Sequence, residues 1–158
     1  EVATWPDLPA ATETALDLEQ AGALKGDVVM ANGCKAYKFS ITDNTGCFTI
    51  KLQGETGGES FLEELTIVSA RIRKKLLGFM NAAKGRKLFF IVEDNNGVKY
   101  LMGDRRRGAI LASDSDGAST GTGATERNQT SLKFQYNAPR ALAYEGDCEN
   151  ILTAAIGG

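Results

Sequence analysis

The side chains that most often perform acid–base or metal chemistry are scarce in this chain. Its 158 residues include no histidine. That absence removes the commonest general base, the Ser-His and Cys-His nucleophile pairs, and most catalytic zinc or iron sites. Glu63 and Glu64 are adjacent, so in a strand they point to opposite faces and cannot act as an acid/base pair. The sequence therefore predicts a protein that is not an enzyme and has no cofactor.

Two polar segments carry weak signals for ligand binding. Residues 114–119 read Asp-Ser-Asp-Gly-Ala-Ser, but the twelfth position of a calcium loop needs a bidentate Glu and is Thr125 here. Residues 120–124 read Thr-Gly-Thr-Gly-Ala and lack the Gly-Lys-Ser/Thr ending of a phosphate-binding loop. We interpret the whole segment 112–124 as one long mobile loop. Loops of this length are usually functional or disordered.

Charge is divided unevenly along a chain whose net charge is only −2. Residues 1–27 hold six acidic residues against one lysine, whereas residues 71–87 hold seven basic residues and no acidic one. Complementary patches between subunits and a solvated helix face explain this segregation equally well.

A compact cationic turn, Gly103-Asp-Arg-Arg-Arg-Gly108, adds to the basic character of the middle of the chain. Phosphate binding would suit such a turn, but no aromatic residues alternate with the cations to stack bases. We therefore favour surface ion pairing, within or between subunits, as the role of the turn.

The three cysteines, Cys34, Cys47 and Cys148, lie far apart and show no metal-ligand spacing, so we expect them to be reduced and structural. No run approaches the roughly 20 apolar residues of a membrane span. The N-terminal residues also lack the pattern of a signal peptide. A reducing cytoplasm is the expected place of synthesis.

The elements that must position these residues are mostly strands. Alternating or short apolar runs, separated by Gly and Asn turns, predict strands over Phe48–Leu52, Phe61–Val68, Gly108–Leu111, Ser131–Tyr136 and Leu142–Tyr144, with a hairpin over 87–102 that turns at Asp94–Gly97. One amphipathic helix is predicted over about 69–84, with Ser69 as its N-cap and Gly85 as the C′ residue.

Together these elements predict a mainly β fold of the α+β class. We expect a β-sandwich or barrel of about eight short strands, with the single helix on one flank. The expected organisation is an N-terminal arm (1–26), a β-domain with one helix (27–149) and a C-terminal tail (150–158).

The order of elements in the second half of the chain resembles a known family. A hairpin that ends in glycine, Phe89–Gly103, leads through a Gly/Ser/Thr loop to the strand in Glu126–Tyr136, and Pro139 follows. Over roughly residues 35–145 this order is similar to the tail-tube (major tail) proteins of tailed bacteriophages. That superfamily includes the inner tubes of contractile injection systems and of type VI secretion.

The resemblance implies a virion structural protein that self-assembles into rings, expected to be hexameric, whose strands join those of neighbours into an inner barrel. Stacked rings would form a tail tube that conducts DNA without sequence-specific binding. The implied partners are further copies of the chain and other tail proteins such as a tape measure, sheath or terminator. The implied location is the virion tail, assembled in the host cytoplasm and not in a membrane.

Within such a tube, the cationic turn and the long loop are the expected assembly interface. Its predicted residues are Arg105, Arg106, Arg107, Ser113, Asp114, Asp116, Gly117, Gly121 and Gly123. Other functions stay open at this stage. One is a head–tail joining, tail-terminator or capsid-decoration protein, and another is a soluble β-domain that grips a ligand with loops 54–60 and 112–124. A histidine-free enzyme has no residue pattern in its favour.

Overall fold

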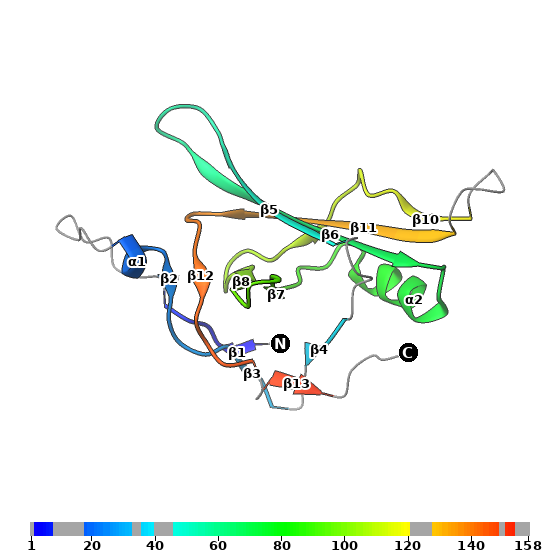
Figure 1. The fold of residues 1–158 in the computed structure, drawn as a ribbon, viewed down its shortest axis with the longest axis horizontal. Helices are drawn as coiled ribbons and strands as arrows, with labels where there is room; N and C mark the ends of the chain where they lie inside the picture. Colours follow the sequence, from blue (N-terminus) through cyan, green and yellow to red (C-terminus); the bar gives the residue numbers. More distant parts are fainter. Residues whose placement is uncertain are drawn as a thin grey trace. The chain divides into compact units, whose positions relative to one another are not determined.

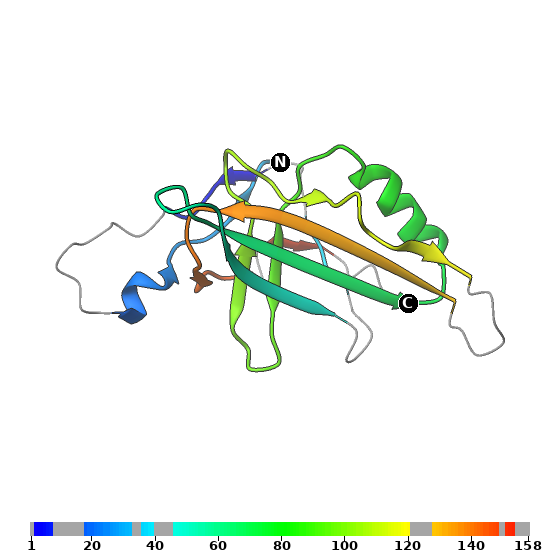
Figure 2. The same cartoon turned by 90° about the horizontal axis from the view of Figure 1, so that it is seen from above.

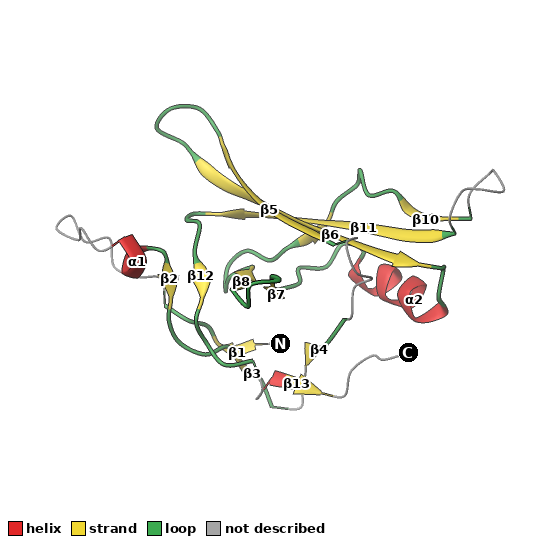
Figure 3. Ribbon diagram, viewed as in Figure 1, coloured by secondary structure: helices red, strands yellow, loops and turns green. Residues whose placement is uncertain are grey.

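A computed structural model describes residues 2–7, 18–32, 36–39, 46–120, 128–148 and 151–153. Strands far outnumber helices in this part of the chain (Figure 3), which confirms the predicted mainly β, α+β class. The chain divides into two compact units. Unit 1 comprises Glu1–Ser40, Ile91–Leu101 and Ala141–Gly158, and unit 2 comprises Ile41–Phe90 and Met102–Arg140. The predicted division into arm, domain and tail stays a prediction.

Unit 1 is built from short strands and one short helix, labelled in Figure 1. Its elements are β1 (Val2–Thr4), α1 (Leu18–Ala21), β2 (Ala23–Leu24), β3 (Val29–Met30), β4 (Ala36–Tyr37), most of β7 (Phe90–Glu93) and β8 (Lys99–Met102), β12 (Ala143–Tyr144) and β13 (Leu152–Thr153). β1 pairs with β3, β4 pairs with β13, and a four-stranded sheet has the order β2-β12-β8-β7. The predicted hairpin turn is present: Gly97 has a positive φ, and the Asp94 carboxylate accepts hydrogen bonds from the N–H groups of Asn96 and Val98.

Unit 2 is dominated by one antiparallel sheet. Its strands are β5 (Cys47–Gln53), β6 (Ser60–Ala70), β9 (Ile110–Leu111), β10 (Gly117–Ser119) and β11 (Gln129–Ala138). The order is β10-β11-β6-β5, with β9 also on β11, and Figure 2 shows the three longest strands side by side. The β6–β11 pairing runs without a break from Ala70 opposite Gln129 to Phe61 opposite Ala138.

Because side chains alternate along a strand, this sheet has two distinct faces. The core face carries Leu65 and Phe134, which are buried and directly opposite each other on β6 and β11. Helix α2 (Lys74–Ala83) packs there, and the ring centre of its Phe79 is 6.0 Å from that of Phe134. The ring centre of Phe90 is 4.6 Å from that of Phe134. The polar face carries Glu64, Lys133 and their neighbours.

The helix begins later than predicted. Ser69 is not an N-cap, because it belongs to β6 and pairs with Thr130 of β11. The chain turns at Arg71, which has φ 81°, and the helix starts at Lys74 without a side-chain cap. Strand pairing thus outweighs the local capping preference of Ser69. Gly85 does follow the helix with φ 70°, as predicted for a C′ glycine.

Three further expectations need correction. Among the described residues every sheet is open, so no closed barrel is found. The segment 112–124 is not loop throughout, because Gly117–Ser119 form β10 and pair with β11. The hairpin's first strand starts at Phe90 rather than Lys87, since Leu88 instead bridges to Ala109. In the last two cases a pairing with a residue distant in sequence sets the local structure.

Candidate functional site

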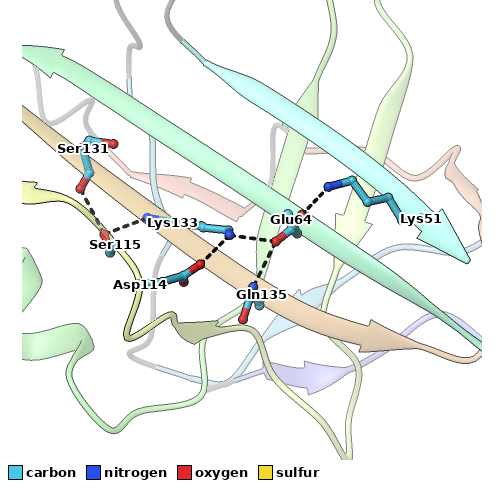
Figure 4. A network of polar contacts seen from close by, with 7 residues as sticks. All are labelled: Lys51, Glu64, Asp114, Ser115, Ser131, Lys133 and Gln135. Atoms are coloured by element: carbon cyan, nitrogen blue, oxygen red, sulfur yellow. Dashed lines mark hydrogen bonds and ion pairs between the residues drawn. The ribbon is translucent and has the colours of Figure 1, made fainter. Parts of the chain in front are cut away.

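The two adjacent glutamates of β6 occupy opposite faces of the unit 2 sheet, as predicted. Glu64 lies on the polar face, and its carboxylate is the centre of the network in Figure 4. Its Oε2 is 2.8 Å from Lys51 Nζ, and its Oε1 accepts bonds from Lys133 Nζ at 3.0 Å and Gln135 Nε2 at 2.9 Å. These donors, with Lys51 contributing most, lower the pKa of Glu64 to about 2.

The same network extends to the segment after β9. Lys133 Nζ also contacts Asp114 Oδ2 at 2.8 Å, and the Ser115 hydroxyl donates to the Ser131 carbonyl and accepts from the Lys133 N–H (Figure 4). The hydrogen bond from Lys133 holds the pKa of Asp114 below its ordinary value, and the bonds to Asp114 and Glu64 raise that of Lys133. Two cations and two anions therefore neutralise one another on the polar face.

Glu63 lies on the core face, where a charge is costly. Only 3% of the residue is exposed, and its Oε2 is buried with no hydrogen-bond partner among the described residues. Burial raises the pKa of Glu63 to about 8. An isolated carboxylate in an apolar environment takes up a proton rather than remain charged, so Glu63 is mostly neutral near pH 7.

The neighbour of Glu63 across the sheet is Tyr136, which is directly opposite on β11. Its hydroxyl donates to Asp104 Oδ2 at 2.7 Å. A phenol has a single hydrogen to donate, so Tyr136 cannot serve as donor to Glu63 at the same time. Burial and the bond to Asp104 raise the pKa of Tyr136 far above its ordinary value, which keeps the hydroxyl protonated.

Asp104 organises the cationic turn that the sequence singled out. Its Oδ1 accepts hydrogen bonds from the N–H groups of Arg106 and Arg107, both at 2.6 Å, and its own N–H donates to the Arg107 carbonyl. Burial acts to raise the pKa of Asp104, but the bonds from Tyr136 and the two amides outweigh it and leave the pKa below its ordinary value. The turn uses backbone groups, so the exposed guanidinium groups are not needed to hold its shape.

The predicted assembly residues lie in three settings. Arg105, Arg106 and Arg107 are exposed in the turn, Ser113, Asp114 and Asp116 are exposed before β10, and Gly117 begins that strand with φ 68°. Gly121 and Gly123 lie outside the described residues. Lys133 links to Asp114, but among the described residues no hydrogen bond or ion pair joins the arginines to this segment. Their shared role in assembly stays a prediction.

β5 is the longer of the two strands at the ends of the order β10-β11-β6-β5. No described strand pairs with the outer edge of β5, whereas β6 and β11 are each paired on both sides. The core-face side chains of β5 include Ile50, which is partly exposed, and Leu52, which is 65% exposed. An open edge beside an exposed apolar side chain is a template for pairing with another chain.

Sequence reasoning missed the two features that distinguish this site. Glu63 shares its side of β6 with Phe61, Leu65 and Ile67, so the alternation alone places it in the apolar row. That signal was available, and only the rarity of unpaired glutamates in a core argued against it. The contact between Tyr136 and Asp104 joins positions 32 residues apart and had no signal in the sequence.

Other classes of site find little support in the described part of the chain. There, no group of three or more Cys, Asp or Glu side chains is placed to hold a metal ion, and no helix is both long and apolar enough to cross a membrane. Cys47 and Cys148 are free thiols, and Cys47 is exposed rather than structural. Comparison with models of protein families, with curated proteins and with solved structures finds no match to this chain. The fold and site thus define a β-rich protein with open sheets.

Proposed function

We propose that this chain is a virion structural protein that assembles with further copies of itself into rings, and that the stacked rings form a phage tail tube through which DNA passes. The proposal joins the family resemblance of residues 35–145 to one observation, the open edge of β5. A ring of head-to-tail contacts pairs every such edge with a neighbour and leaves none exposed.

The edge strand lacks the protection that soluble sheets usually carry. Natural edges are blunted by lysines, prolines or bulges. β5 contains no proline, and its seven register pairs with β6 are continuous. Its single lysine, Lys51, is directed to Glu64 at 2.8 Å, so the charge that would repel an approaching strand is compensated. These features favour a strand that receives a partner.

The compensated charges of the polar face are consistent with a surface along which DNA passes without being bound. Affinity for the phosphate backbone depends on cations that are available to displace counterions. On this face Lys51 and Lys133 are engaged by Glu64 and Asp114 within 3.0 Å. A wall of this kind offers phosphates little attraction, which suits a conduit.

The test compares two exposed leucines of unit 2. Leu52→Lys places a charge beside the open edge, whereas Leu77→Lys places the same charge on α2, where the residue is 38% exposed. Both side chains are exposed, so we expect both variants to fold and to melt near the wild-type temperature. Sedimentation velocity and negative-stain microscopy should show rings or tubes for the wild type and for Leu77→Lys, and their loss in Leu52→Lys.

The outcomes separate the competing functions. A wild-type chain that stays monomeric at high concentration would contradict assembly altogether and favour a soluble binding domain. A finite ring that never stacks would favour a head–tail joining or terminator protein instead of a tube. Normal tubes from Leu52→Lys would show that the β5 edge is not the interface.

A further inference from the structure

Glu63 sits where the edge strand joins the sheet. Its register partners are Ile50 on β5 and Tyr136 on β11, and all three share the core face. The residue is 3% exposed, and its Oε2 has no hydrogen-bond partner among the described residues. A buried polar atom without a hydrogen-bond partner costs about 1–3 kcal/mol of folding free energy even when it is uncharged. A charge at this position would cost more.

No cation among the described residues is placed to compensate an ionised Glu63. On β5 the core-face neighbours are apolar. On β11 the facing group is Tyr136, whose hydrogen is given to Asp104, and beyond it the turn contributes the negative Asp104 and the exposed Arg107. The cations Lys51 and Lys133 project from the opposite face and bind Glu64. Loss of the Glu63 proton therefore creates an unpaired charge.

Release of β5 is the way we consider for hydrating that charge. β11 pairs with β6 on one side and with β9 and β10 on the other, whereas β6 is the only described strand that pairs with β5. Releasing β5 breaks its seven register pairs with β6 and the contacts of Lys51 and Gln53, and it removes Ile50 from beside Glu63, which opens that side of the carboxyl to water. Edge segments open at a lower free energy than the whole domain.

We propose that Glu63 is a proton-operated latch for the edge strand: β5 stays docked on β6 while the carboxyl keeps its proton, and detaches when the proton leaves. The O–H bond breaks, the proton passes to a solvent base, and acidification returns it. The latch itself is a property of one subunit. Only its consequence, that pH governs the surface offered to a neighbour, rests on the proposed assembly through β5.

The direction of the pH dependence follows from the two states of the strand. Burial raises the pKa of Glu63 from 4.5 to about 8 when β5 is docked, and detachment returns it toward its ordinary value. The docked state therefore holds more protons between these limits, and opening becomes more favourable as pH rises through this window. For one proton the opening equilibrium rises about tenfold per pH unit.

Hydrogen exchange of backbone amides, monitored by mass spectrometry between pH 5 and 8, tests the latch in the whole 158-residue chain. Protection factors, corrected for intrinsic exchange, should fall about tenfold per pH unit for the β5 amides, and at every pH they should be lower than those of the β6–β11 pair, which exchanges only when the whole unit unfolds. The pH-dependent fall in β5 protection should disappear in Glu63→Gln and in Glu63→Leu. Two variants are used so that the test can still be made if one of them folds poorly. Glu64→Gln should retain the pH-dependent fall.

Two results would overturn the latch. One is a β5 protection factor that is constant over the window, or that falls equally in the Glu63 variants. The other is a protection factor that is the same for β5 and for the β6–β11 pair at every pH, which would mean that β5 opens only when the whole unit unfolds. Neither result depends on rings or tubes, so failure of the latch and failure of the assembly proposal are distinguishable.

Discussion

Replacing each of the two adjacent glutamates by glutamine should change the pH dependence of global stability in opposite directions. The pKa of Glu63 is raised to about 8 in the folded chain, so its contribution to stability is complete below pH 4.5 and is lost as pH rises toward 8. The pKa of Glu64 is lowered to about 2, so its contribution is present above pH 4.5 and is lost as pH falls toward 2.

The raised pKa of Glu63 determines how much the free energy of unfolding changes with pH. Each pH unit between the unfolded and folded pKa values costs about 1.4 kcal/mol, so the free energy of unfolding should fall by about 3 kcal/mol between pH 5 and pH 7. That is a large share of the 5–15 kcal/mol typical of a domain. Glu64 is bound to the exposed Lys51 among others, and solvent screening limits its contribution to about 1 kcal/mol.

The composition leaves few other groups that titrate between pH 5 and 7. The chain contains no histidine, so no other side chain has an ordinary pKa between pH 5 and 7. Urea unfolding followed by circular dichroism at each pH gives the free energies. We expect a decline for the wild type and Glu64→Gln, and a nearly flat profile for Glu63→Gln.

Parallel stability profiles of the wild type and Glu63→Gln between pH 5 and 7 would contradict the raised pKa of Glu63. Parallel profiles would mean that Glu63 titrates alike in the folded and unfolded chain and so reaches water when folded. Glu64→Gln tests the opposite sign, since it should lose stability relative to the wild type at pH 7 and approach it near pH 2. A variant pair with the same sign would contradict the assignment of the two faces.

Four further variants have expected outcomes. Phe134→Ala should destabilise the chain by about 3–5 kcal/mol in urea unfolding, because the ring is fully buried between two other aromatic rings. Gly78→Ala should stabilise it by up to about 1 kcal/mol, since the position is helical and open, whereas Gly108→Ala should lower the melting temperature because a Cβ there would lie 2.6 Å from that of Lys87. Reversing the charges of residues 105–107 should leave the melting temperature unchanged and weaken assembly in sedimentation, and unchanged assembly would show that these arginines are merely solvated.

The strands of unit 2 were predictable because their signal is local. Alternation over 48–52 and 131–136 has a period of two, and that period corresponds to one half-buried strand in each case. The C-terminal end of the helix was predictable for the same reason, since Gly85 supplies the positive φ. The strand ends were less so, because pairing carries β6 on to Ala70.

The features that were missed depend on distant partners. Gly117–Ser119 have little strand propensity and become β10 only because β11 lies beside them. Ser69 has the chemistry of a cap but is used by the β6–β11 ladder. The link between Tyr136 and Asp104 joins a strand to a turn. The local sequence around these residues contains no pattern that predicts any of these contacts.

The position of Glu63 connects the pH dependence to the edge strand. A leucine at this site would pack among Phe61, Leu65 and Ile67 without a charge to desolvate, and at neutral pH the glutamate costs stability relative to such a residue. Glu63 is the register partner of Ile50 on β5, and among the described strands β5 is the one long strand of the sheet whose outer edge is open. Had the carboxyl been on the polar face, the network around Glu64 would have absorbed its charge. In the proposed latch, the apolar surroundings of Glu63 make its ionisation costly. Because β5 is at the edge of the sheet, loss of that proton can release this one strand.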